Sequence, residues 1–152
     1  MTSSGVISID KQVIGFCLNI DFFNKVKNKI DRTMFDNELK DIFDTIVYSH
    51  TKYDRSLSVP ELSTIFNDRN PAMPDSARNR VQDMIVQLVA PKESDELHTD
   101  IVNNLWLRDK ARQIGEKALD IFTGDSDEFG ELKKLIESVD DGRIGDKTTY
   151  TI

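Results

Sequence analysis

The sequence predicts an all-α fold, in which a compact head of about five helices precedes an antiparallel helical hairpin. Apolar residues recur at the i, i+3, i+4, i+7 spacing of a helix face throughout residues 9–139. Ser58-Val-Pro-Glu61 is a strong helix start signal, and residues 94–122 contain no proline and are followed by Gly124. We therefore expect a disordered lead at residues 1–8, the head at 9–91, the hairpin at 92–139 and a linker at 140–152.

Two short helices are expected first. Asp10 is a candidate cap for one helix and Asp21 for the next, because an aspartate side chain can accept hydrogen bonds from the first free backbone N–H groups. Few residues separate the two helices, so they should be neighbours. Their expected core residues are Val13, Ile14, Cys17 and Leu18 in the first, and Phe22, Phe23, Val26 and Ile30 in the second.

Three further helices complete the expected head. Residues 33–53 carry a buried helical stripe, with His50 near its end as a packed or exposed imidazole rather than a ligand. A capping box with proline in the first turn starts the next helix at Ser58. The fifth helix runs from about Asp75 to Ala90, where Pro91 ends it.

The stretch from Ser94 to Phe122 predicts one long helix, and a short turn at Gly124 returns the chain along it. In its first half the apolar stripe is narrow, through Leu97, Ile101 and Leu105. In its second half the apolar arc is roughly 200° wide, more than a helix needs against one core. This width indicates contact with the returning helix and with a second copy. The candidate interface residues are Trp106, Leu107, Ala111, Ile114, Ala118, Ile121, Phe122, Phe129 and Leu132.

Three side chains of the long helix leave alternatives open. Trp106 points away from the local stripe, so it docks on the head or forms an intermolecular contact. Arg108 and Arg112 fall inside the stripe. They pair with acids such as Glu128 or Glu131 on the returning helix, or present charge to another subunit or to single-stranded DNA.

Composition limits the class of protein. With 38% hydrophobic and 31% charged residues, the chain is typical of a globular protein with one core. A net charge of −7 argues against a dedicated duplex-DNA binder. The single cysteine, Cys17, excludes an internal disulfide and favours a cytoplasmic location. No apolar run is long enough to span a membrane.

The sequence carries no motif for catalysis or for cofactor binding. His50 and His98 lie in different helices, and no pair of residues has the spacing of a zinc or calcium site. Residues 142–148 superficially resemble a phosphate-binding loop, but Asp146 stands where the loop needs glycine before Lys147. We therefore expect no catalytic residue, metal or cofactor in this chain.

The order of the elements resembles the N-terminal domain of hexameric replicative DNA helicases of the DnaB family, especially those of tailed phages. The resemblance spans residues 9–139 and concerns helix order and apolar pattern. The segments that carry it are IFDTIVYSHTKY, LSVPELSTIF, RVQDMIVQLVA, HTDIVNNLWLRDKARQIGEKALDIF and GELKKLIE.

The resemblance implies a non-catalytic collar domain. Such domains pair through hairpins and heads as dimers, trimers or hexamers, and they bind primase or a helicase loader. ATP and Mg²⁺ would belong to a RecA-like motor domain, so the parent protein would be an ATP-dependent helicase. Weak contact with single-stranded DNA is also compatible with this function.

Two other functions remain open from the sequence. One is a stand-alone phage replication factor, either a helicase loader or a helicase inhibitor, which would use the same surfaces in trans. The other is a small DNA-binding helical domain, such as a small terminase subunit, against which the acidic charge counts.

Overall fold

The computed structural model describes residues 8–91, 96–125 and 127–141. The regular elements of these residues are all helices, with no strand among them, which confirms the all-α prediction for this part of the chain. The predicted lead and linker lie largely outside this part of the chain. Residues 140 and 141 belong to the last helix, so the linker does not begin at 140. The elements are α1 (Ile9–Phe16), α2 (Ile20–Val26), a 3₁₀ turn (Arg32–Met34), α3 (Asn37–Tyr53), α4 (Val59–Arg69), α5 (Asp75–Val86), α6 (Glu96–Thr123) and α7 (Phe129–Asp141).

The helix starts follow local capping chemistry, although two caps differ from the predicted ones. The Ser8 side chain accepts a hydrogen bond from the N–H of Lys11, and α1 therefore begins before Asp10. Asn19 caps α2 in the same way, two residues before the predicted cap Asp21. The capping box at α4 is confirmed. The Glu61 N–H donates to Ser58 Oγ at 3.2 Å, and the Ser58 N–H donates to Glu61 Oε1 at 2.9 Å.

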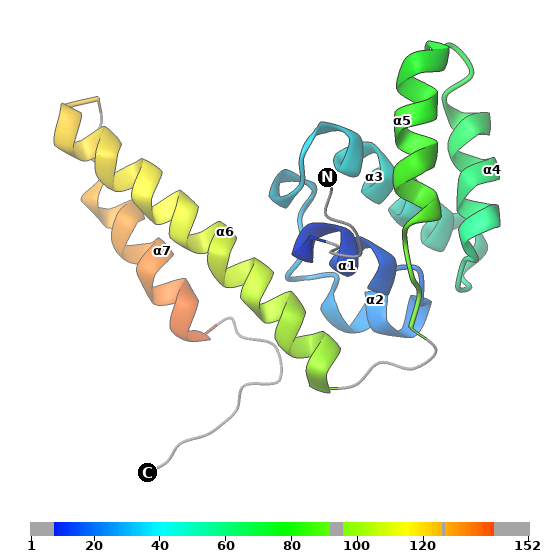
Figure 1. The fold of residues 1–152 in the computed structure, drawn as a ribbon. Helices are drawn as coiled ribbons and strands as arrows, with labels where there is room; N and C mark the ends of the chain where they lie inside the picture. Colours follow the sequence, from blue (N-terminus) through cyan, green and yellow to red (C-terminus); the bar gives the residue numbers. More distant parts are fainter. Residues whose placement is uncertain (1–7, 92–95, 126, 142–152) are drawn as a thin grey trace.

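One hydrophobic core joins α1–α5 to the first half of α6. Figure 1 shows this half of α6 beside α1 and α2. Its members are apolar side chains at helical spacing. The core residues predicted for the first two helices are all buried, and Phe16, which was not predicted, joins them, whereas Tyr53 at the end of the predicted stripe of residues 33–53 is 45% exposed. The largest side chains that are almost completely buried are Phe22, Phe66, Ile14, Leu18, Ile42, Ile46, Leu62, Ile85 and Leu105.

The fifth helix ends four residues earlier than predicted. α5 stops at Val86, and the chain then passes directly over α1 at Gly15. A Cβ atom at Gly15 would lie 2.6 Å from the carbonyl oxygen of Val89, closer than a side chain tolerates. Because this backbone contact faces Gly15, the Val89 side chain points to solvent and is 70% exposed.

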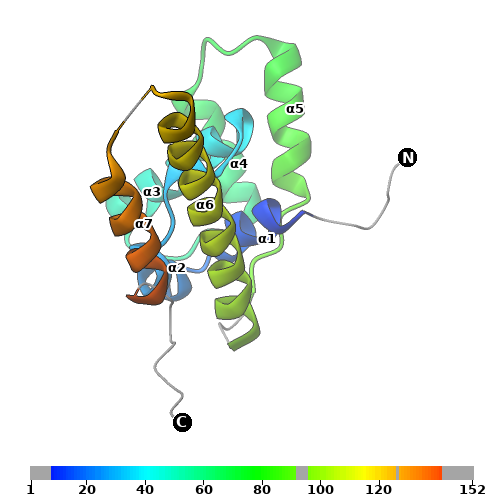
Figure 2. The ribbon, with the colours of Figure 1, turned by 90° about the vertical axis from the view of Figure 1, so that its left-hand side faces the viewer.

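The helices α6 and α7 form the second part of the fold. They run antiparallel and side by side, and the far half of α6 extends beyond the α1–α5 helices (Figures 1 and 2). α6 docks on the core through residues up to Asp109. Among the described residues from Lys110 to Val139, none is buried.

The first half of α6 packs differently from the prediction. Leu97 was expected in the core stripe, but its side chain is 63% exposed. The helix instead turns a partly polar side to the core, because the surrounding helices bury Thr99 and Asp109 as well as apolar residues. Ser94, the predicted cap, lies outside the described residues. The buried residues of α6 are Thr99, Val102, Leu105, Trp106 and Asp109.

Candidate functional site

The candidate site is the surface of the α6–α7 pair. Each helix carries a row of half-buried apolar side chains, and since the two helices pack on each other, these rows face one another. Their spacings of three, four or seven residues keep each row on one side of its helix. The row in α6 contains Leu107, Ile114 and Ile121, and the row in α7 contains Leu132, Leu135 and Val139.

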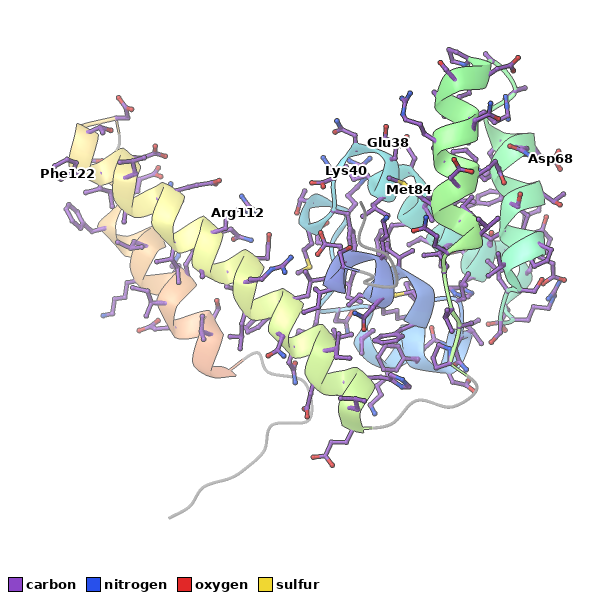
Figure 3. All side chains as sticks on the ribbon, in the orientation of Figure 1. Glu38, Lys40, Asp68, Met84, Arg112 and Phe122 are labelled. Carbon is purple, nitrogen blue, oxygen red and sulfur yellow. The ribbon has the colours of Figure 1, made fainter. Side chains whose placement is uncertain are left out.

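The remaining apolar side chains form what we call the outer face of the pair. Four of the predicted interface residues lie on it, together with Leu119 and Ile136, which were not predicted. The aromatic rings are the most exposed, with Phe122 at 86% and Phe129 at 64%. Phe122 lies at the end of α6 farthest from α1–α5 (Figure 3). The outer face consists of Ala111, Ala118, Leu119 and Phe122 on α6 and of Phe129 and Ile136 on α7.

The opposite side of the pair is a charged groove. This open groove has a volume of about 610 Å³, and acids and lysines from both helices alternate along it, among them Glu116, Asp120, Glu131 and Lys134. The two sides of the pair therefore differ in chemistry. One is charged and hydrated, and the other presents apolar surface to water.

Lys117 fastens α7 to α6 at the edge of this groove. Its ammonium group lies 2.8 Å from Glu128 Oε1 and 3.4 Å from Glu131 Oε1. The hydrogen bond to Glu128, followed by that to Glu131, raises the pKa of Lys117. These contacts fix the axial position of α7 along α6, and they thereby position the outer face.

Trp106 is part of the contact between α6 and the core, not of the outer face. Its side chain is only 5% exposed, which corrects its place among the candidate interface residues. The Lys29 ammonium, from the chain after α2, lies 5.1 Å from the centre of the ring, and that of Lys110 lies 5.7 Å from it. Since the indole is covered by its own chain, it is not available to stack on a partner.

Arg108 and Arg112 pair with acids other than the predicted ones. Arg108 reaches Asp10 of α1 at 2.7 Å. Arg112 bonds Asp109 at 2.7 Å and Glu116 at 3.0 Å, both within α6. The prediction failed because Lys117, which is nearer the turn than either arginine, pairs with both Glu128 and Glu131. Both arginines are therefore ion-paired within the chain.

The side chains most often used in catalysis have structural roles here. His50 Nε2 lies 2.6 Å from the carbonyl oxygen of Cys17, and Nδ1 lies 3.2 Å from that of Arg55. The His98 ring packs against Phe16, with centroids 4.5 Å apart. Burial raises the pKa of the Cys17 thiol to about 12, so it stays protonated near neutral pH.

The described residues contain neither a cluster of metal-binding side chains nor a membrane-spanning helix. No group of three or more histidine, cysteine, aspartate or glutamate residues in them could hold a metal ion. Among the helices that these residues form, none has the length and apolar character required to cross a membrane.

The chain was also compared with known proteins. No protein-family model, no curated protein and no solved structure matches it.

Proposed function

We propose that this chain is the N-terminal collar domain of a replicative DNA helicase of the DnaB type. In this function, α1–α5 with the first half of α6 form the head, and α6–α7 form the hairpin that assembles the ring. The domain would bind primase or a helicase loader and would perform no chemistry itself. The single observation that carries the proposal is the exposed apolar outer face on a helix pair that extends beyond the core.

Exposed apolar surface of this kind favours association. Phe122, Phe129, Leu119 and Ile136 are between 50% and 86% exposed, and they are spread over two neighbouring helices. Each large apolar side chain that a partner fully covers contributes roughly 1.5–3 kcal/mol. Contiguous apolar patches are typical of interaction sites, whereas isolated apolar side chains need no explanation.

The attachment of α6 also supports an assembly function. One continuous helix is anchored by Leu105 and Trp106 in the core at one end and carries Phe122 at the other. A rigid helix transmits the position of the core to the outer face, so that a partner bound there is held in a fixed orientation. A collar needs this property because its subunits must remain in register around a ring.

Sedimentation equilibrium of the chain tests the proposal. We expect reversible self-association at micromolar concentration, and capture of a primase or a helicase loader by the immobilised chain. The matched pair of variants is Phe129→Asp, on the outer face, and Val86→Asp, on α5, where the valine is 67% exposed. Only the first should weaken association. A strictly monomeric chain that captures neither partner would exclude the collar function.

A second capture experiment separates the collar from a stand-alone replication factor. A loader or inhibitor acts in trans, so it should bind a complete helicase ring that already has its own collar. A collar domain should instead exchange only with isolated subunits. Stable binding to the assembled ring would replace our proposal with the stand-alone factor.

A further inference from the structure

Lysines from three parts of the chain gather around Trp106 and the adjoining end of the charged groove. Lys25 belongs to α2 and Lys29 to the turn that follows it, whereas Lys110 belongs to α6 and Lys134 to α7. Figure 1 shows α2 beside the first half of α6, with α7 on the far side of α6. We call Lys25, Lys29, Lys110 and Lys134 the lysine track.

Trp106 lies between the two central members of the track. The ammonium group of Lys29 is 5.1 Å from the centre of the indole, and that of Lys110 is 5.7 Å from the same point. The two charges are therefore no more than about 11 Å apart. Lys25 lies four residues before Lys29, and the Lys29 N–H still donates to the Val26 carbonyl, so both lysines lie on one side of this turn.

The track continues from Trp106 into the charged groove. Lys110 lines the groove together with Gln113 on the same helix and Lys134 and Ser138 on α7. The acids that line it, Glu116, Asp120 and Glu131, lie nearer the turn between the two helices. The end of the groove that is closer to α1–α5 is therefore its positively charged end.

The lysines of the track are not neutralised by the chain itself. In the part of the chain that the structure describes, none of the four forms an ion pair with a carboxylate. This is unexpected in a sequence with 27 acidic and 20 basic residues. Lys117, by contrast, holds two carboxylates. Like charges that are kept close together repel one another, and a bound anion would relieve this repulsion.

The surroundings of the track favour a short acidic peptide over a nucleic acid. Trp106 is only 5% exposed, so no base can stack on it. The net charge of −7 and the acids farther along the groove repel a phosphate backbone that continues beyond the track. In an extended peptide, side chains on one face recur about every 7 Å. Two or three carboxylates on that face therefore span the distance between Lys29 and Lys110.

We propose that the lysine track binds a short acidic segment of a partner protein, whose carboxylates lie between Lys29 and Lys110 and beside Lys134. This site uses the groove side of the α6–α7 pair, opposite the apolar outer face. It therefore goes beyond the proposed collar function and does not require self-association.

Peptide binding to the full chain tests the proposal. The probe is hexaglutamate, fluorescein-labelled for anisotropy and unlabelled for intrinsic fluorescence, at low ionic strength. We expect a saturable rise in anisotropy. Trp106 is the single tryptophan of the sequence, so its emission reports on the track directly and should change over the same range of peptide concentration. Hexaglutamine, which is uncharged, should produce neither change.

Variants locate the binding site. Lys29→Gln combined with Lys110→Gln should weaken hexaglutamate binding at least about tenfold, because both central charges are lost. The matched control is Lys52→Gln on α3, since Lys52 also lies over aromatic rings, at 5.6 Å from Tyr48 and 5.5 Å from Tyr53. Lys52→Gln should leave the affinity unchanged. Circular dichroism of each variant should match that of the unmodified chain.

Three outcomes would overturn the proposal. One is the absence of saturable binding of hexaglutamate. Another is equal weakening by Lys52→Gln, which would show a response to net charge rather than to the track. The third is tighter binding of an oligothymidylate of similar length, lost in the Lys29→Gln and Lys110→Gln variant, which would replace the peptide by a nucleic acid. Self-association of that variant should equal that of the unmodified chain in sedimentation, so the collar function is tested separately.

Discussion

The two halves of α6 behave in opposite ways although they belong to one helix. The first half, up to Asp109, buries five residues, of which Thr99 and Asp109 are polar. The second half has the wider apolar arc in the sequence and buries none of its described residues within the chain. Apolar content alone therefore does not decide which part of a helix enters the core.

The difference has a simple geometric cause. Around its first half, α6 is met by α1 and by the turn before α3, which together close one side of the helix. Around its second half, its main neighbour among the described helices is α7, and one helix covers only a narrow strip of another. The surplus apolar width of the second half remains exposed, which is why we assign it to a partner.

The largest predicted effect compares equivalent truncations in the two halves. Leu105→Ala should lower the free energy of unfolding by about 2–5 kcal/mol, because Leu105 is 2% exposed in the core. Leu119→Ala, at 59% exposed, should change it by less than about 0.5 kcal/mol. Urea unfolding followed by circular dichroism, at a concentration below that of self-association, measures both. Equal losses would mean that the second half also lies in the core.

The second comparison uses two glycines within helices. Gly15→Ala should destabilise the chain by about 1–3 kcal/mol, because the new methyl group would press on the backbone at Val89. Gly115→Ala should stabilise it by up to about 1 kcal/mol, since space is open there and alanine favours the helix. Thermal unfolding should move the two midpoints in opposite directions. Stabilisation by Gly15→Ala would show that α1 and the chain after α5 are not in close contact.

The smallest predicted effect concerns two sets of ion pairs. One joins Arg55 to Glu61 at the start of α4, and the other joins Lys117 of α6 to the acids at the start of α7. The hydrogen bond from Arg55, followed by that from the Ser58 backbone, lowers the pKa of Glu61 from 4.5 to about 2. A lowered pKa stabilises the fold at pH values above about 4.5, and this contribution is lost as the pH falls towards 2. Glu61→Gln keeps the capping hydrogen bonds but removes the charge.

At pH 6, Glu61→Gln should have a lower urea midpoint of unfolding than the unmodified chain. The difference between the two midpoints should narrow as the pH is lowered to 2. Lys117, which joins α6 to α7, gives a pH dependence of stability with the opposite sign. Its raised pKa stabilises α7 on α6 below pH 10.5, and this contribution is lost as the pH rises further. A constant difference between the Glu61→Gln variant and the parent across the acid range would show that the charge of Glu61 does not matter.

Much of the fold could be predicted from the sequence because its signals are local. Helical spacing of apolar residues identified the helices, and the capping box at Ser58 and Glu61 marks the start of α4 to the residue. Local signals were less reliable where two polar residues competed for one cap. Ser8 and Asn19, rather than Asp10 and Asp21, cap α1 and α2, since each accepts from an N–H three residues later.

The candidate site was predictable in composition but not in detail. The excess apolar width of the second half of α6 was visible in the sequence, and Ala111, Ala118, Phe122 and Phe129 are exposed as an interface requires. Leu107, Ile114, Ile121 and Leu132 are half-buried where the two helices meet, so their role is within the chain. Distinguishing these groups depends on the side from which α7 approaches, and no local pattern specifies that side.

The sequence by itself determined the helices, their order and the surplus of apolar surface on α6. Tertiary structure alone decided three further points: that Trp106 is covered by Lys29 and Lys110, that Lys117 takes the acids expected for the arginines, and that Leu97 faces outwards. The physical reason is that helix formation depends on neighbours a few residues apart. Burial and ion pairing depend instead on which helix arrives from elsewhere in the chain, and at what angle.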